Sequence, residues 1–256
     1  MFRPRIIPVL LLRGQGLVKT VRFSNPTYIG DPINAVRLFN DYRADELVFL
    51  DINASSERRI VSGELVRKIG DEAFMPFSIG GGITNIEQIR ELLSLGAEKV
   101  VMNTIVPGHM SLIGEASKIF GSQSIMVSVD VKKMILGGYR IMTMGGRKGI
   151  NTALGQYIKD IESAGAGEIL INSIDRDGTM SGYDIALTKE VSSSVKIPVI
   201  ACGGAGSLSD MKKAYTEGGA SACAAGSMFV YHGLRKGVLI NYPDRSEILT
   251  AFSNAS

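Results

Sequence analysis

Short runs of apolar residues recur along the whole chain, and polar or turn-forming residues separate them. Runs of this length without alternation are typical of strands that are buried on both faces, as in a parallel sheet. Between the runs, apolar residues recur three and four positions apart, which indicates amphipathic helices. The pattern predicts strands at 6–12, 46–52, 76–80, 99–103, 124–130, 168–172, 197–202 and 222–226. It predicts helices at 32–43, 57–72, 84–95, 110–120, 152–164, 184–194 and 207–217, and a last helix after residue 233.

Strict alternation of strand and helix over eight units favours a closed (β/α)8 TIM barrel, an α/β fold with its helices outside. An open doubly wound sheet is the alternative, but its usual Gly-x-Gly-x-x-Gly motif does not follow the first strand. The chain has 256 residues and contains no linker or low-complexity tract. We therefore expect residues 1–256 to form a single domain.

The second half of the chain repeats the first. Gly81–Gly82 falls on Gly203–Gly204 after a shift of 122 positions, and Asn103–Thr104 falls on Gly226–Ser227 after one inserted residue. The period is close to half the chain, which indicates a twofold repeat of half-barrels and argues against a solenoid.

Each half carries a glycine-rich loop directly after a buried strand. Glycine lets backbone N–H groups approach an anion closely, and a helix that begins there adds partial positive charge. Two such loops in equivalent places predict that both ends of a bisphosphate ligand are bound. The candidate phosphate-binding residues are Gly81, Gly82, Asn103 and Thr104 in the first half, and Gly203, Gly204, Ala225, Gly226 and Ser227 in the second.

Composition narrows the range of partners. The formal net charge is only +3 and no basic cluster is interleaved with aromatic residues, so we expect no nucleic-acid partner. No apolar stretch reaches the roughly 18 residues of a membrane helix, and the run at 6–12 is too short for a signal peptide. His109 and His232 lack ligand-like spacing, so we expect no metal and no cofactor. Cys202 and Cys223 lie in apolar strands, as in proteins of the reducing cytoplasm, where we place this chain.

The longest connections, 13–30 and 131–151, follow the first and fifth strands, are related by the repeat, and are candidate lids on the catalytic face. A simple surface excursion is the alternative.

Asp130 ends the fifth strand, where barrel enzymes carry catalytic groups, and is a candidate general acid or base. A shift of 119 positions places Leu11 at the equivalent point of the first half. One of two expected titratable groups is therefore replaced by an alkyl side chain.

Nearly the whole chain resembles the cyclase subunit of imidazole glycerol phosphate synthase, the ammonia-using barrel of histidine biosynthesis. The resemblance implies a glutaminase subunit as partner and a phosphorylated small molecule as ligand. It is carried by Arg5-Ile6-Ile7-Pro8, Gly30-Asp31-Pro32, residues 44–52, Gly80-Gly81-Gly82, Gly145-Gly146-Arg147-Lys148, residues 165–170, residues 175–179, Gly182-Tyr183-Asp184 and residues 203–206.

The resemblance also implies roles for single residues. Asp130 matches one of two catalytic aspartates, whereas Leu11 replaces the other. Lys19 matches a lysine near the bound ligand, and Asp51 and Asp177 match acidic residues of the ligand cleft. Four charged residues that begin strands match the family's ammonia gate, and we call them the basal ring: Arg5, Glu46, Lys99 and Glu168. Without the resemblance, the same four residues would be interpreted as a structural salt-bridge plug.

Two functional hypotheses follow. In the first, the barrel pairs with a glutaminase and passes ammonia to a sugar amidotransferase of surface-polysaccharide synthesis. In the second, it is an active cyclase in which Asp130 works with Asp51 or Asp177. A phosphosugar isomerase fits the fold as well, but normally needs both aspartates.

Overall fold

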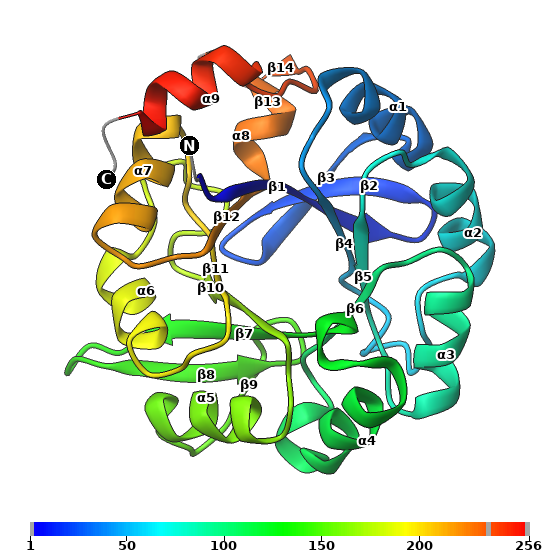
Figure 1. Cartoon of the computed structure of the whole chain (residues 1–256), viewed down its shortest axis with the longest axis vertical. Coiled ribbons are helices and arrows are strands. Elements are labelled where there is room, and N and C mark those ends of the chain that lie inside the picture. The colour runs from blue at the N-terminus through cyan, green and yellow to red at the C-terminus, as the bar shows by residue number, and fades with distance from the viewer. Residues whose placement is uncertain (1–2, 234–236, 254–256) are drawn as a thin grey trace.

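Eight parallel strands close into a barrel in the computed structural model, which describes residues 3–233 and 237–253 (Figure 1). Each strand pairs with the next, and the last pairs with the first through the register Arg5↔Ala222 to Pro8↔Ala225. The (β/α)8 fold is therefore confirmed, whereas the assignment of all residues to one domain stays a prediction. The barrel strands are β1(Arg5–Arg13), β4(Leu47–Asp51), β5(Phe77–Gly80), β6(Lys99–Met102), β7(Ile125–Lys133), β10(Glu168–Ser173), β11(Val199–Cys202) and β12(Ala222–Ala225).

Helices surround the barrel, and most begin at a side-chain cap. Asp31, Ser62, Asn85, Asp184 and Ser207 each accept a hydrogen bond from the backbone N–H three residues on. The helices are α1(Pro32–Tyr42), α2(Gly63–Glu72), α3(Ile86–Ser94), α4(Ser111–Phe120), α5(Leu154–Ser163), α6(Ile185–Ser192), α7(Leu208–Thr216), α8(Ser227–Val230) and α9(Arg245–Phe252). Short 3-10 turns lie at Val106–Gly108 and Ser122–Ser124.

The second helix starts later than predicted. Residues 52–58 form turns in place of helix, because the Asp51 carboxylate accepts hydrogen bonds from the backbone N–H groups of Asn53 and Ala54. Ser62 then caps α2.

The two long connections form ordered antiparallel strands, which the apolar pattern did not predict. β1 turns back through β2(Gly16–Val21) and β3(Ser24–Gly30), and β7 turns back through β8(Tyr139–Thr143) and β9(Lys148–Gly149). Both extensions continue the hydrogen bonding of a barrel strand, which satisfies backbone groups that a loop would leave to water. A further pair, β13(Tyr231–His232) and β14(Gly237–Val238), lies near the chain's end.

Alternate residues of each strand face the helices or the barrel interior. In β1, Ile6 and Leu10 join the outer core, whereas Ile7 and Val9 join the inner one. This double burial explains the unbroken apolar runs in the sequence. The inner cluster fills the middle of the barrel with Ile7, Val9, Val48, Val101, Met126, Leu170, Ile200, Ala222 and Ala224. The interior is thus a packed core and not an open pore.

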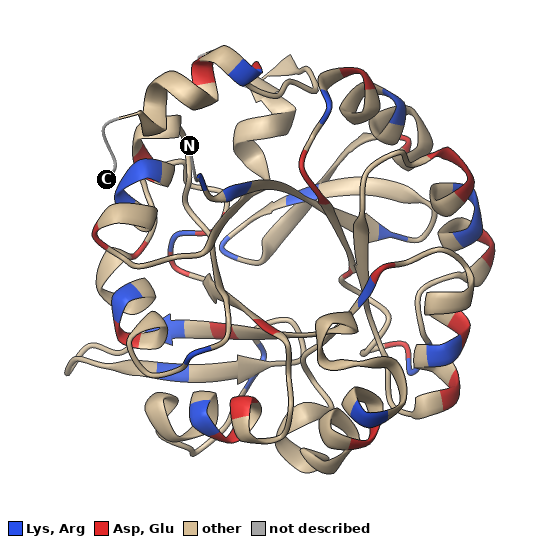
Figure 2. Cartoon of the chain, viewed as in Figure 1, with Lys and Arg blue, Asp and Glu red and all other residues tan. Residues whose placement is uncertain are grey.

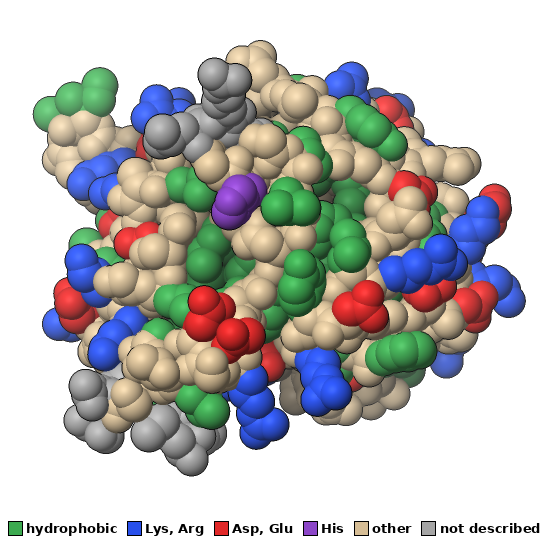
Figure 3. Space-filling model, turned by 90° about the horizontal axis from the view of Figure 1, so that it is seen from above, with side chains coloured by type: hydrophobic (Ala, Val, Ile, Leu, Met, Phe, Trp, Pro, Cys, Tyr) green, Lys and Arg blue, Asp and Glu red, His purple; other side chains and the backbone are tan. Residues whose placement is uncertain are grey.

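Charged residues of both signs alternate over the outer helices (Figure 2). The face in Figure 3 likewise mixes charged and hydrophobic side chains. Among the described residues, no helix is long and apolar enough to cross a membrane.

Candidate active site

A cavity of about 350 Å³ opens at the carboxyl ends of the barrel strands. This is the end at which barrel enzymes place their active sites. Of the residues predicted for catalysis, phosphate binding and the ligand cleft, all except Gly204 and Ala225 line it. The predicted residues in its wall are Lys19, Asp51, Gly81, Gly82, Asn103, Thr104, Asp130, Asp177, Gly203, Gly226 and Ser227.

The first glycine loop leaves no room for side chains. Gly81 and Gly82 have φ angles of +133° and +73°, and a Cβ atom on Gly82 would lie 1.8 Å from the carbonyl oxygen of Arg59. The loop therefore presents bare backbone to the cavity. Asn103, which is predicted to bind phosphate, lines the cavity as well, and its Nδ2 donates to the carbonyl oxygen of Ser128 at 3.0 Å and to Asp130 Oδ2 at 2.9 Å.

The second loop repeats this construction. Gly203 and Gly204 have φ angles of +86° and +110°, and a Cβ on Gly204 would lie 2.2 Å from the carbonyl oxygen of Gly182. At Gly226 the steric constraint is a side chain, because a Cβ there would lie 2.1 Å from Lys19 Nζ. The absence of a side chain at Gly226 lets the lysine reach the cavity wall.

Asp130 is buried and held by two amides. Oδ2 accepts from Asn103, and Oδ1 accepts from Asn172 Nδ2 at 3.2 Å. Burial raises the pKa of Asp130 to about 7, against the opposing effect of the two amide donors. A carboxyl group that titrates near neutrality can both take and give a proton.

Asn172 was missed by the sequence analysis. It lies on the inner side of β10, two residues beyond Leu170, and its parity along the strand is the signal that would have placed it in the cavity. Its Oδ1 atom is buried and has no hydrogen-bond partner among the described residues.

Lys19 lies in β2 with its ammonium group buried. Nζ donates to the carbonyl oxygen of Val9 at 2.6 Å. Burial lowers the pKa of Lys19 to about 8, and attraction to Asp177 opposes the shift. Asp177 accepts from Thr20 Oγ1 at 3.2 Å, and burial raises its pKa. Lys19 and Asp177 thus add two further titratable groups to the wall.

Asp51 is engaged within the protein. Oδ2 pairs with Arg59 Nη1 at 2.6 Å, while Oδ1 holds the turn at Asn53 and Ala54. It lines the cavity but is committed to structure, which makes it a poor acid–base partner for Asp130.

Leu11 lies in an apolar part of the wall. It is half-buried, pairs with Leu50 of β4 in the sheet register, and packs with Leu50 and Cys202 against the inner cluster.

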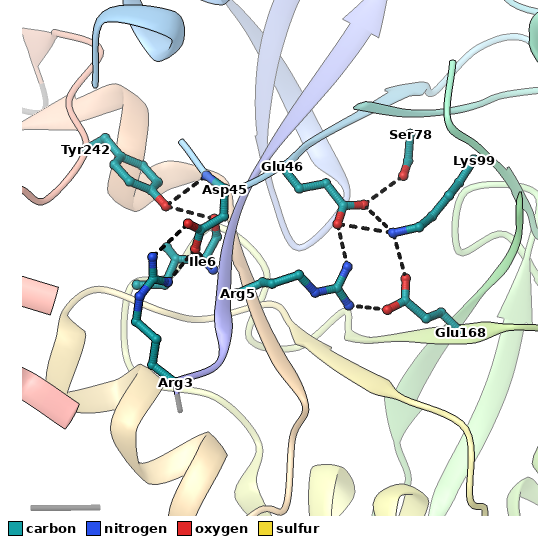
Figure 4. A network of polar contacts seen from close by, with 9 residues as sticks. All are labelled: Arg3, Arg5, Ile6, Asp45, Glu46, Ser78, Lys99, Glu168 and Tyr242. Carbon is teal, nitrogen blue, oxygen red and sulfur yellow. Dashed lines mark hydrogen bonds and ion pairs between the residues drawn. The ribbon is translucent and has the colours of Figure 1, made fainter. Parts of the chain in front are cut away.

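The basal ring closes the opposite end of the barrel (Figure 4). Arg5 pairs with Glu46 at 2.5 Å and also with Glu168. Lys99 Nζ lies 3.0 Å from Glu46 and 3.1 Å from Glu168, so each cation contacts both anions. Ser78 Oγ donates to Glu46 at 3.0 Å. The sequence grouped these four residues correctly, because each occupies the same level at the start of its strand.

A second network borders the ring (Figure 4). Nη1 and Nη2 of Arg3 donate to the Asp45 carboxylate, at 2.5 and 2.8 Å, and Asp45 accepts from the backbone N–H of Ile6 at 2.9 Å. The Tyr242 hydroxyl donates to the carbonyl oxygen of Ile6 at 3.0 Å. These contacts tie the chain's two end regions together beneath the barrel.

Comparison with known proteins agrees with the resemblance seen in the sequence. Residues 5–235 match the family of histidine biosynthesis proteins. The chain is 46% identical over 248 residues to a Pseudomonas aeruginosa protein named, with a provisional qualifier, imidazole glycerol phosphate synthase subunit hisF2; the match covers 97% of this chain and 99% of that one. A similarly named Leptospira interrogans protein is 45% identical, with 96% and 98% covered. The imidazole glycerol phosphate synthase subunit HisF of Alkaliphilus metalliredigens is 43% identical over 232 residues, with 91% and 92% covered. The chain therefore belongs to the histidine biosynthesis protein family, among the HisF-like subunits of imidazole glycerol phosphate synthase.

Proposed function

We propose that this barrel works with a glutaminase subunit and conducts ammonia from the basal ring to the cavity, for delivery to a sugar amidotransferase of surface-polysaccharide synthesis. The observation that carries the proposal is an asymmetry between the two ends. The basal ring has all four of its charges, whereas the cavity has an alkyl group, Leu11, where a partner acid for Asp130 is expected.

The basal ring can open at one member. The Arg5 side chain is 34% exposed, whereas Glu46, Lys99 and Glu168 are buried. Rotation of Arg5 into water would rehydrate its charge while Lys99 still bridges both carboxylates. The inner cluster beyond is apolar, so neutral ammonia can cross it by small side-chain movements, but the ammonium ion would lose its hydration at great cost.

The cavity suits ligand binding better than efficient cyclisation. Loss of one of two proton-transfer groups typically costs about 10²–10⁴ in rate. Asp130 and the glycine loops would still bind and position a phosphorylated ligand in the cavity.

A second candidate is an active cyclase of histidine biosynthesis. It would convert phosphoribulosylformimino-aminoimidazole carboxamide ribotide and ammonia to imidazole glycerol phosphate. The observation in its favour is the pKa of Asp130 near 7 between two intact glycine loops. Asp177 or Lys19 would supply the second proton-transfer group, since Asp51 is paired with Arg59.

The test compares cyclase turnover of the wild type and Leu11→Asp, with ammonium chloride as nitrogen source. We expect the wild type to turn over at least a hundredfold more slowly than a working synthase, and Leu11→Asp to gain at least tenfold. Leu50→Asp is the control, because it adds an acid to the same apolar wall on the neighbouring strand. Turnover of the wild type at the rate of a working synthase would establish the cyclase in place of ammonia delivery to a sugar amidotransferase.

A further inference from the structure

The tip of the β7–β8 hairpin, Met134–Gly138, exposes two large aliphatic side chains completely. Ile135 and Leu136 are 103% and 101% exposed, as open to water as in an extended peptide, and Met134 is 45% exposed. Adjacent side chains of this size rarely stand free on a soluble surface unless something binds them. Figure 1 shows the hairpin extending beyond the outline of the barrel.

The hairpin is built to hold this tip outward. Its strands pair in register from Asp130↔Met142 to Lys133↔Tyr139. The turn is closed by a hydrogen bond from the N–H of Met134 to the carbonyl of Gly138, at 3.0 Å, and Gly138 has a φ angle of +77°. Beside the turn, the N–H of Lys133 donates to Asp175 Oδ2 at 2.7 Å. The apolar tip is thus a preorganised feature.

The equivalent turn of the first half differs. A shift of 119 positions places Met134 on Gln15, in the turn between β1 and β2, and that turn consists of Gly14 and Gln15. Neither residue has a large apolar side chain. The exposed aliphatic pair is therefore particular to the β7–β8 turn.

Basic side chains flank the hairpin tip on both strands. Lys132, Lys133 and Arg140 are exposed, and none of them makes an ion pair within residues 3–233 and 237–253. The complementary surface is an apolar pocket edged with carboxylates. A membrane would gain only two or three inserted side chains, which is a marginal anchor.

We propose that the hairpin tip docks the enzyme that accepts the ammonia, through an apolar pocket with an acidic edge on that enzyme. This inference rests on the proposed conduit function. The hairpin continues the strand that carries Asp130, and so it stands at the end of the barrel where the cavity opens. The basal ring lies at the other end. A partner on the hairpin tip is therefore bound at the cavity end of the barrel, to the side of the barrel axis (Figure 1).

The first test is direct binding of the purified barrel to the purified sugar amidotransferase encoded in the same genome. The Ile135→Ser/Leu136→Ser variant should bind at least tenfold more weakly without a change in melting temperature, because both side chains contact only water. Lys132→Glu/Lys133→Glu should also weaken binding and reduce its salt dependence. Phe74→Ser is the control, since Phe74 is 87% exposed but precedes β5 at the basal end.

The second test reconstitutes the barrel, a glutaminase subunit and the amidotransferase. The hairpin variant should lower amidation with glutamine at least fivefold, yet leave the glutaminase rate and amidation with ammonium chloride unchanged. Failure of the wild type to support amidation with glutamine would remove the conduit function, while the binding assay still judges the docking site.

Three results would overturn the docking proposal. The first is equal binding of the wild type and the hairpin variant, or no binding by either. The second is concentration-dependent dimerisation in sedimentation that the hairpin variant abolishes, which would make a second copy the occupant. The third is variant-sensitive binding to phosphatidylcholine–phosphatidylglycerol vesicles, which would make it a membrane.

Discussion

Asp130 shows how one buried carboxyl group can be tuned by its surroundings. Its two amide donors, Asn103 and Asn172, stabilise the charged form, yet removal from water favours the neutral form more strongly. The Asn103 donor was predicted to serve phosphate binding. Its side-chain amide also holds the Asp130 carboxylate, because Asn103 directly follows β6, the strand next to β7, and its role in phosphate binding stays a prediction.

The raised pKa of Asp130 predicts a pH dependence of folding stability. Burial shifts this pKa from 3.8 to about 7, so between these values the folded chain holds a proton that the unfolded chain has released. The stabilisation that comes from this extra bound proton is fully present below about pH 4 and is lost as the pH rises through 7. Three pKa units correspond to about 4 kcal/mol at most. In urea titrations from pH 4 to 8, we expect the free energy of unfolding to fall more for the wild type than for Asp130→Asn. Parallel curves for the two proteins would contradict the assigned environment.

Strands are the elements that the sequence located best. Each predicted barrel strand overlaps the observed one within a few residues, since burial on both faces leaves a run of apolar letters. The hairpins were missed because they mix buried and exposed stretches: β2 is mostly buried, whereas β3 is mostly exposed and leaves no apolar run. The sequence did not predict the orientation of the Asp51 side chain either. This orientation depends on an ion pair with Arg59, which follows the turn after β4.

The contacts of the basal ring predict how much the loss of each cation lowers the free energy of unfolding. Lys99 is buried and contacts both glutamates, so Lys99→Met should destabilise the fold by about 3–5 kcal/mol. Arg5→Met should cost clearly less, because Arg5 is partly exposed and Lys99 continues to bridge the carboxylates. Urea unfolding measures both.

Lys68→Met is the control for loss of a lysine charge. Lys68 pairs with Glu64 on the exposed face of α2, and its loss should change stability by no more than about 0.5 kcal/mol. An equal cost for the Arg5 and Lys99 variants would mean that the basal ring has no weaker member, and Arg5 would then be no better suited than Lys99 to open it.

At the scale of the whole molecule, two ends with different chemistry are joined through an apolar core. The glycine loops and titratable groups lie at one end, the basal ring lies at the other, and the inner cluster separates them. A barrel that only bound a phosphorylated ligand would not require the basal ring to communicate with the cavity. A conduit would require it, and this difference can be measured by obstructing the middle of the barrel.

Ala224 offers the place to do so. It is fully buried in the inner cluster on β12, where a larger side chain would occupy the space beside the barrel axis. Ala224→Val should overpack the interior by about 1–3 kcal/mol and narrow the route from the basal ring. Ala116→Val, equally buried but in the outer core on α4, should carry a similar stability cost without touching that route. The measurement uses a reconstituted system with a glutaminase subunit and the sugar amidotransferase. We expect Ala224→Val to reduce formation of the amidated sugar from glutamine at least fivefold. Glutaminase turnover and formation of the amidated sugar from ammonium should be preserved. Ala116→Val should leave all three rates unchanged. Equal losses with glutamine and with ammonium would mean that the substitution disturbs the cavity and not the route. No loss with either would mean that ammonia does not pass beside Ala224.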